Sequence, residues 1–327
     1  MGRSPPGTPL PGYPRGPGRE TACASTAEVA SRSRRWGIDV YRTPDERFAA
    51  LPDYPFQPHW LEADGLRMHY VDEGTGDPVL LVHGEPTWSF LWRKTIPPLA
   101  GNRRAIAPDL LGFGRSDKPT DAGWYSYDKH VASIARLVEA LALERITLVV
   151  HDWGGPIGLR FAVEHSELVD RIVILDTGIG GGKPPSELWL RFRAVVREVG
   201  GALDIGRLVE AGTAQGLTDD VRAAYDAPFP TPESKAAPLA FPEHVPTEPE
   251  HPNTAPMNRV RDALGAWEKP VLVVWGAEDT VLPPAVAEQF VQLIPGATGP
   301  VLVGGASHFL QEDRPDDVTA AIAGFLA

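Results

Sequence analysis

The chain has 327 residues, of which 43% are hydrophobic and 23% charged, a composition typical of a globular protein with a sizeable core. Its formal net charge of −12 argues against nucleic acid or an anionic membrane as a partner, because both bind basic surfaces. The single cysteine, Cys23, excludes an intramolecular disulfide, and no apolar run approaches the roughly 18–20 residues of a membrane span. Met1–Pro17 lacks the apolar segment of a signal peptide, so we expect a cytoplasmic protein, with a monomer as the default.

The predicted elements begin after a tail. Residues 1–35 are rich in Pro, Gly and small polar residues, which predicts disorder. Short apolar runs then alternate with helical patterns. The predicted strands are Leu66–Val71, Pro78–Val82, Arg104–Ala107, Ile146–Val150, Arg171–Leu175, Pro270–Trp275 and Pro300–Val303. The predicted helices between them are Asp128–Leu143, Gly155–Glu164, Pro284–Leu293 and Asp316–Leu326. Continuous apolar runs suit strands buried on both faces, so the pattern predicts a doubly wound, mostly parallel α/β sheet.

The alternation breaks between about residues 177 and 265. Helical patterns at Ser186–Val199, Ile205–Ala211 and Asp219–Asp226 precede a Pro-rich section from Pro228 to Pro256, without a buried strand. An insertion there lies above the carboxyl ends of the strands, where open α/β sheets bind ligands. The predicted organisation is therefore a tail (1–35), a core (36–176 and 266–327) and a helical cap (177–265).

The strongest motif is the run from Val149 to Gly155, Val-Val-His-Asp-Trp-Gly-Gly. A buried strand, a sharp turn and a helix follow one another, which is the nucleophile elbow of α/β-hydrolases with Asp152 where serine usually stands. Small residues at 154 and 155 let the helix approach the strand closely. An aspartate that only caps the helix is the structural alternative, and the motif alone favours a nucleophile by about two to one.

Three further motifs follow predicted strands. His83-Gly84-Glu85-Pro86 places the backbone N–H of Glu85 where it can form an oxyanion hole with the N–H of Trp153. His308, on the loop after the last strand, is the expected general base. Asp279, in Trp275-Gly276-Ala277-Glu278-Asp279, is the expected acid that orients it. Asp176, at the end of the preceding strand, is the competing candidate for that acid.

An aspartate nucleophile determines the chemistry. A carboxylate is ionised at pH 7, so it can displace a leaving group from saturated carbon without a base. The product is an alkyl ester, which water activated by His308 then hydrolyses. Carbon–halogen bonds and epoxides both suit this scheme, which requires no metal or organic cofactor.

The leaving group separates these two substrates. A departing halide needs hydrogen-bond donors, and an indole N–H such as that of Trp153 is a donor only. An opening epoxide needs an acid that protonates its oxygen, and in related hydrolases this acid is usually a pair of cap tyrosines. The predicted cap contains a single tyrosine, Tyr225. These residues therefore favour a halide leaving group over an epoxide. A non-catalytic ligand receptor on the same scaffold is a third hypothesis, less favoured because the candidate triad is complete.

From about Ile38 to Ala327 the chain resembles the haloalkane dehalogenases whose triad acid follows the later strand. The resemblance is carried by four segments, which are specific together and not singly: residues 83–89 (HGEPTWS), 151–155 (HDWGG), 225–230 (YDAPFP) and 308–313 (HFLQED). It implies Asp152 as nucleophile, His308 as base and Asp279 as acid. It also implies a small apolar halogenated substrate and a halide product.

The resemblance further implies two halide donors, Trp153 and a cap tryptophan. Here the sequence departs from the family pattern, because Phe192 stands at the second position and has no N–H to give. Trp189, three residues earlier, could share a helical face with it. Either Trp189 substitutes, or halide binding rests on Trp153. A second departure is Asp176, where relatives often carry a neutral residue.

Overall fold

The computed structural model describes residues 33–35, 37–184 and 186–327. Cys23 and most of the predicted tail lie outside them. Ser33–Arg35, which we assigned to the tail, forms a short strand that pairs antiparallel with Ile38–Tyr41. A local hairpin of this kind is held by backbone hydrogen bonds, which a composition argument does not detect.

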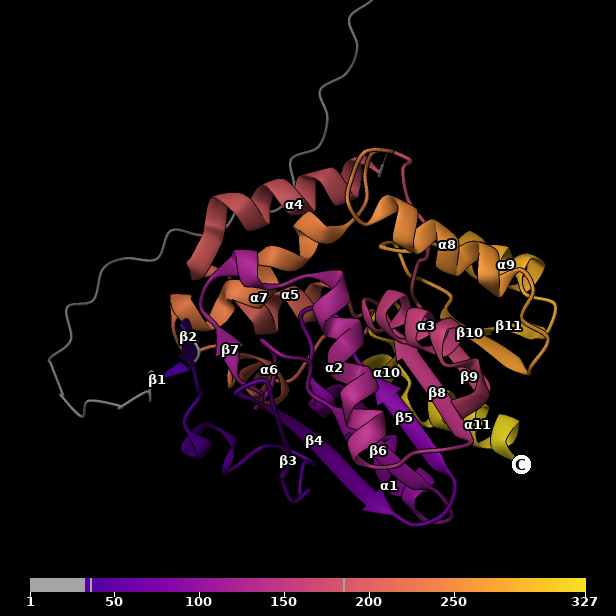
Figure 1. The fold of residues 1–327 in the computed structure, drawn as a ribbon, viewed down its shortest axis with the longest axis horizontal. Helices are drawn as coiled ribbons and strands as arrows, with labels where there is room; N and C mark the ends of the chain where they lie inside the picture. Colours follow the sequence, from indigo (N-terminus) through magenta and orange to yellow (C-terminus); the bar gives the residue numbers. More distant parts are fainter. Residues whose placement is uncertain (1–32, 36, 185) are drawn as a thin grey trace, which may run out of the picture.

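An eight-stranded sheet forms the centre of the molecule, in the order β11-β10-β9-β8-β5-β6-β4-β3 (Figure 1). The strands are β1 (Ser33–Arg35), β2 (Ile38–Tyr41), β3 (His59–Ala63), β4 (Leu66–Gly74), β5 (Pro78–Val82), β6 (Arg104–Pro108), β7 (Lys118–Pro119), β8 (Ile146–His151), β9 (Val169–Leu175), β10 (Val271–Gly276) and β11 (Ala297–Val303). The strands β3 and β4 run antiparallel to their neighbours, and the other pairs in this sheet are parallel. The predicted mostly parallel α/β sheet is confirmed.

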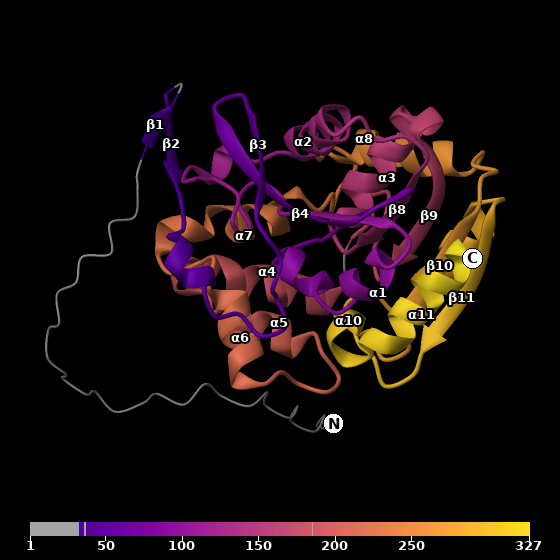
Figure 2. The same ribbon diagram turned by 90° about the horizontal axis from the view of Figure 1, so that it is seen from below.

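Helices cover both faces of the sheet. They are α1 (Ile96–Ala100), α2 (Tyr127–Ala140), α3 (Gly154–Glu164), α4 (Glu187–Val199), α5 (Ile205–Ala211), α6 (Asp219–Asp226), α7 (Ala236–Ala240), α8 (Thr254–Leu264), α9 (Pro284–Leu293), α10 (Leu310–Asp313) and α11 (Pro315–Leu326). In Figure 2, α1 and α11 lie on one face, and α2, α3 and α8 lie on the other. None of the helices in the described ranges is long and apolar enough to cross a membrane. A cytoplasmic location stays a prediction.

The described residues of the segment 177–265, which leave out position 185, form helices and no strand, and α4 extends across the top of the molecule in Figure 1. Side-chain caps start α4 and α6: Ser186 accepts the N–H of Trp189, and Thr218 accepts that of Val221. The segment also contains α8, which packs against α3 beside the sheet. The Pro-rich section contains α7 and the start of α8, because proline is compatible with the first turn of a helix.

The parallel strands place their carboxyl ends at one edge of the sheet. Within β5 and β8 the residues Val79–Val82 and Ile146–His151 are buried, as expected of central strands covered on both faces. The loops after β5, β8, β9, β10 and β11 therefore converge, and they carry the residues that we predicted from the sequence.

Candidate active site

The turn between β8 and α3 holds Asp152 in a left-handed conformation with φ 48°, which is unusual for a residue other than glycine. Close packing enforces this turn. A Cβ at position 154 would clash with the carbonyl oxygen of Val82, and one at position 155 would clash with the hydroxyl of Thr177. That hydroxyl donates to the backbone carbonyl of Asp152 at 2.6 Å. The two glycines therefore permit the elbow and fix the nucleophile candidate at the sheet edge.

The structure brings the three predicted triad side chains together. His308 Nε2 lies 3.5 Å from Asp152 Oδ2, and His308 Nδ1 lies 2.9 Å from Asp279 Oδ2. Asp176 does not occupy the position of Asp279. Its carboxylate accepts the backbone N–H of Gly276 instead.

The electrostatics follow from this arrangement. Burial would raise the pKa of Asp152, but the hydrogen bond and charge of His308 outweigh it and hold the pKa below its ordinary value. Burial would likewise lower the pKa of His308, yet Asp152 and Asp279 together raise it well above the usual range. The site therefore contains an ionised carboxylate before substrate arrives.

The second oxygen of the Asp152 carboxylate is held by backbone. Oδ1 accepts the N–H of Glu85 at 2.7 Å, and the backbone N–H of Trp153 also stabilises the carboxylate. A Cβ at position 84 would clash with Asp152 Oδ1 and lie 2.5 Å from the Trp153 nitrogen. Gly84 thus allows the backbone to approach the nucleophile closely enough to donate.

The Glu85 side chain is an unusual neighbour for a carboxylate. Its Oε1 is buried and has no hydrogen-bond partner in the described part of the chain. Burial and the charge of Asp152 raise the pKa of Glu85 well above its ordinary value. Both effects disfavour a second negative charge beside Asp152.

The predicted halide donors lie in different surroundings. The Trp153 ring packs edge-on against Phe241, at 5.2 Å between centroids, and faces His244 of the cap at 6.3 Å. Trp189 on α4 is half-buried, with the guanidinium of Arg193 4.7 Å from its ring centroid. Phe192 packs against the core from the same helix. No ring contact joins Trp189 or Phe192 to Trp153 among the described residues.

Sequence reasoning missed His151, the residue before the nucleophile. It is buried, its ring lies 5.0 Å from that of His308, and its Nε2 makes a 2.7 Å hydrogen bond to the backbone carbonyl of His308. Burial, followed by the charge of His308, lowers the pKa of His151 to about 4, so it is neutral. A polar residue at the end of an otherwise apolar strand was the only signal, since its partner is 157 positions away.

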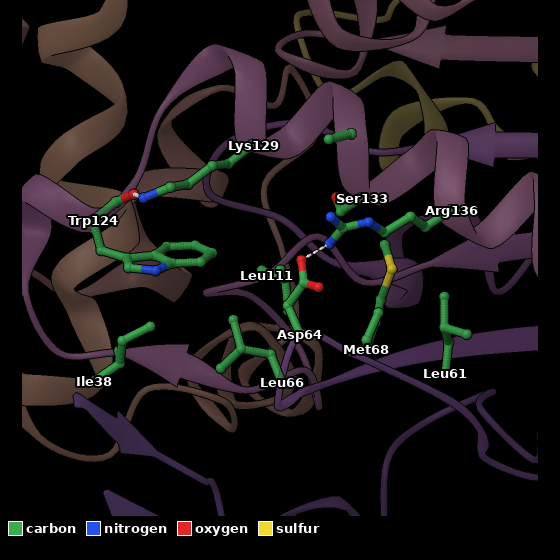
Figure 3. A pocket seen from close by; sticks show the side chains of 12 residues that line it. Ile38, Leu61, Asp64, Leu66, Met68, Leu111, Trp124, Lys129, Ser133 and Arg136 are labelled. Carbon is green, nitrogen blue, oxygen red and sulfur yellow. Dashed lines mark hydrogen bonds and ion pairs between the residues drawn. The ribbon is translucent and has the colours of Figure 1, made fainter. Parts of the chain in front are cut away.

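A pocket of about 210 Å³ lies elsewhere, between β3, β4 and α2 (Figure 3). It is lined mainly by apolar side chains and flanked by the ion pair of Asp64 and Arg136. None of the predicted site residues lines it. This pocket is therefore separate from the candidate active site.

Comparison with known proteins identifies the family. Residues 77–315 match the family model described as alpha/beta hydrolase fold. A haloalkane dehalogenase of Mycobacterium marinum is 45% identical, covering 87% of this chain and 99% of that protein. Another, from Psychrobacter cryohalolentis, is 38% identical and covers 88% of this chain and 98% of its own.

Solved structures agree with these sequence relatives. The tetrameric structure of a haloalkane dehalogenase from Paraglaciecola agarilytica superposes with a TM-score of 0.81 at 34% identity, covering 86% of this chain and 97% of that one. The chain therefore belongs to the haloalkane dehalogenases, hydrolases of carbon–halogen bonds with the α/β-hydrolase fold.

Proposed function

We propose that the chain hydrolyses haloalkanes to an alcohol, a halide ion and a proton through a covalent alkyl ester on Asp152. One observation carries the proposal. The Asp152 carboxylate is ionised, with Oδ1 held by the backbone N–H of Glu85 and Oδ2 3.5 Å from the His308 imidazole. A carboxylate held in this way is a nucleophile for the first step and an acyl group for the second.

In the first step the oxygen that is not held by the backbone attacks the carbon that bears the halogen. A carbon–oxygen bond forms, the carbon–halogen bond breaks, and the bonding pair leaves with the halide. No proton moves, so His308 is not needed as a base at this stage. The indole N–H of Trp153 is the donor that we assign to the departing halide. The raised pKa of Glu85 favours this step, because a second carboxylate would repel the departing anion.

In the second step water attacks the carbonyl carbon of the ester. His308 accepts the proton of the water, and Asp279 stabilises the imidazolium that results. Negative charge develops on Oδ1, which already accepts the N–H of Glu85, and the backbone N–H of Trp153 also stabilises this carboxyl group. As this intermediate collapses, the bond to the alkyl oxygen breaks and that oxygen takes the proton from the His308 imidazolium, so the alcohol leaves. The carboxyl of Asp152 then loses the remaining proton of the water to solvent, which regenerates the carboxylate.

The alternative, epoxide hydrolysis, lacks its acid. The only cap tyrosine, Tyr225, is buried, and its hydroxyl donates to Glu312 at 2.5 Å. The hydroxyl of Tyr225 is therefore hydrogen-bonded to a carboxylate outside the triad and does not serve as the acid for an epoxide. We assign halide stabilisation to Trp153 rather than Trp189, since Trp153 directly follows the nucleophile and Trp189 lies under Arg193.

The direct test measures bromide released from 1-bromobutane and 1,2-dibromoethane, with diol formation from a simple epoxide measured in parallel. We expect bromide release that is abolished by Asp152→Asn. Trp153→Phe should reduce it strongly, while Trp189→Phe, the matched control, should change it little. Diol formation without bromide release would reverse the assignment. Tight ligand binding that survives Asp152→Asn, without turnover, would instead favour a receptor.

The assembly of the chain stays a prediction. The Paraglaciecola agarilytica relative is described as tetrameric, whereas we expect a monomer as the default for this chain. Light scattering coupled to size-exclusion chromatography distinguishes the two states.

A further inference from the structure

Asp176 is a fully buried carboxyl that the proposed reaction does not use. It follows β9 in a left-handed conformation with φ 33°. Its side chain accepts the backbone N–H of Gly276 at 3.0 and 3.2 Å, and its backbone carbonyl accepts the N–H of Asp152 at 3.2 Å. Asp176 therefore connects the nucleophile elbow to the end of the strand that leads to the triad acid.

The carboxyl of Asp176 also lies beside the triad. One of its oxygens, one carboxylate oxygen of Asp279 and one ring nitrogen of His308 all lie within 4.8 Å of one another. His308 is the basic group that faces the two acids. Because the two buried carboxyl groups lie this close together, ionisation of one disfavours ionisation of the other, which favours a proton on one of them.

Hydrogen-bond donors decide which acid holds that proton. Asp279 accepts the ring N–H of His308 at 2.9 Å and the backbone N–H groups of Val281 and Leu282 at 2.7 and 3.0 Å. Asp176 accepts a single backbone N–H, that of Gly276. Because donors favour the ionised form, Asp279 carries the charge and Asp176 carries the proton.

The direction of the pKa shifts agrees with this assignment. Burial, and after it the charge of Asp279, raises the pKa of Asp176 well above its ordinary value. Burial opposes ionisation of Asp279 as well, but the hydrogen bond and charge of His308 outweigh it and lower its pKa.

We propose that Asp176 is a positioning residue of the triad: it donates a hydrogen bond from its protonated carboxyl to Asp279, and it takes over as the acid behind His308 when Asp279 is neutralised. The proposal rests on the function assigned above, since it requires His308 to act as the base. Replacing Asp279 by asparagine removes the charge that keeps Asp176 protonated. Asp176 then ionises within reach of the imidazolium that forms during ester hydrolysis.

The experiment compares Asp176→Asn, Asp279→Asn and the double variant in single-turnover kinetics with 1-bromobutane. Formation of the alkyl ester should be similar in all three, because the attack by Asp152 needs no base. Hydrolysis of the ester should fall less than about tenfold in Asp176→Asn, since the amide still donates to Asp279. It should fall roughly 10–100-fold in Asp279→Asn and about 10⁴-fold in the double variant, the loss typical of a triad without its acid.

An equal loss in Asp279→Asn and in the double variant would overturn the proposal. So would a loss in Asp176→Asn as large as that in Asp279→Asn. Thermal unfolding measurements show whether each variant is folded. If the double variant does not fold, a fall of about 10⁴-fold in the rate of ester hydrolysis in Asp279→Asn alone contradicts the proposal. Failure of the wild type to form an ester would instead refute the proposed function.

A spectroscopic measurement is independent of kinetics. The infrared difference spectrum between wild type and Asp176→Asn at pH 7 should contain the C=O band of a protonated carboxyl. Glu85 is present in both proteins, so its own carboxyl band cancels in the difference spectrum. A carboxylate band in its place would overturn the assignment of the proton to Asp176.

Discussion

Replacing Tyr225 by phenylalanine should cost stability and leave dehalogenation intact. The hydroxyl of Tyr225 donates to the buried carboxylate of Glu312 at 2.5 Å, which connects the cap to the core. A hydrogen bond to a charged group contributes about 1.5–3 kcal/mol. The carboxylate keeps its two bonds from Arg93, at 2.5 and 2.8 Å, so the loss should lie at the low end of that range. The ring of the phenylalanine preserves the edge contact with Phe90, at 5.2 Å between centroids.

The expected fall in the free energy of unfolding is therefore about 1.5–2 kcal/mol. At about 2 °C per kcal/mol for a domain of this size, the melting temperature should fall by roughly 3–4 °C. Differential scanning calorimetry measures this shift, and bromide release measures kcat on the same samples. Unchanged melting with a loss of activity would refute the reasoning, because it would show that Tyr225 acts in the reaction and not in the attachment of the cap.

Three further predictions follow from contacts in the same region and in the active site. Glu312→Gln leaves the guanidinium of Arg93 buried without its anion, and the free energy of unfolding measured by urea denaturation should fall by about 3–5 kcal/mol; a loss below that of Tyr225→Phe would contradict this. Gly84→Ala pushes the backbone donor away from Asp152, and kcat should fall about 10²–10³-fold with folding retained; unchanged kcat would count against the oxyanion hole. Ester hydrolysis needs neutral His308, and the neighbouring carboxylates raise the pKa of His308, so lowering the pH should slow turnover. The initial burst of halide should persist at the lower pH, because the pKa of Asp152 is lowered and its carboxylate stays ionised. Stopped-flow halide detection measures both phases, and a parallel decline of the two would disprove this prediction.

The main strands and helices could be predicted because burial on both faces of a sheet requires continuous apolar runs. The run at Ile146–Val150 and the helix after it are found within a residue or two of the expected bounds. The edge strand His59–Ala63 was missed, since its residues are half-buried or exposed and show no apolar run. Lys118–Pro119 was missed because a two-residue strand is defined by its partner, Val40–Tyr41, far away in the sequence.

The positions of the site residues could be predicted for a topological reason. Parallel strands end at one edge, so motifs that follow β5, β8, β10 and β11 meet without any knowledge of side-chain packing. Contacts between loops could not be predicted in this way. The relation of Asp176 to Asp279 depends on how two turns pack, and the surroundings of Trp189 depend on the packing of the cap, which amphipathic patterns do not fix.

The central claim is that Asp152 becomes covalently alkylated and that His308 is needed only to hydrolyse the ester. Mass spectrometry of His308→Ala after reaction with 1-bromobutane tests it most directly. The account predicts one molar equivalent of released bromide and a single butyl group on the peptide that contains Asp152. Unmodified protein, or a butyl group on another peptide, would contradict it.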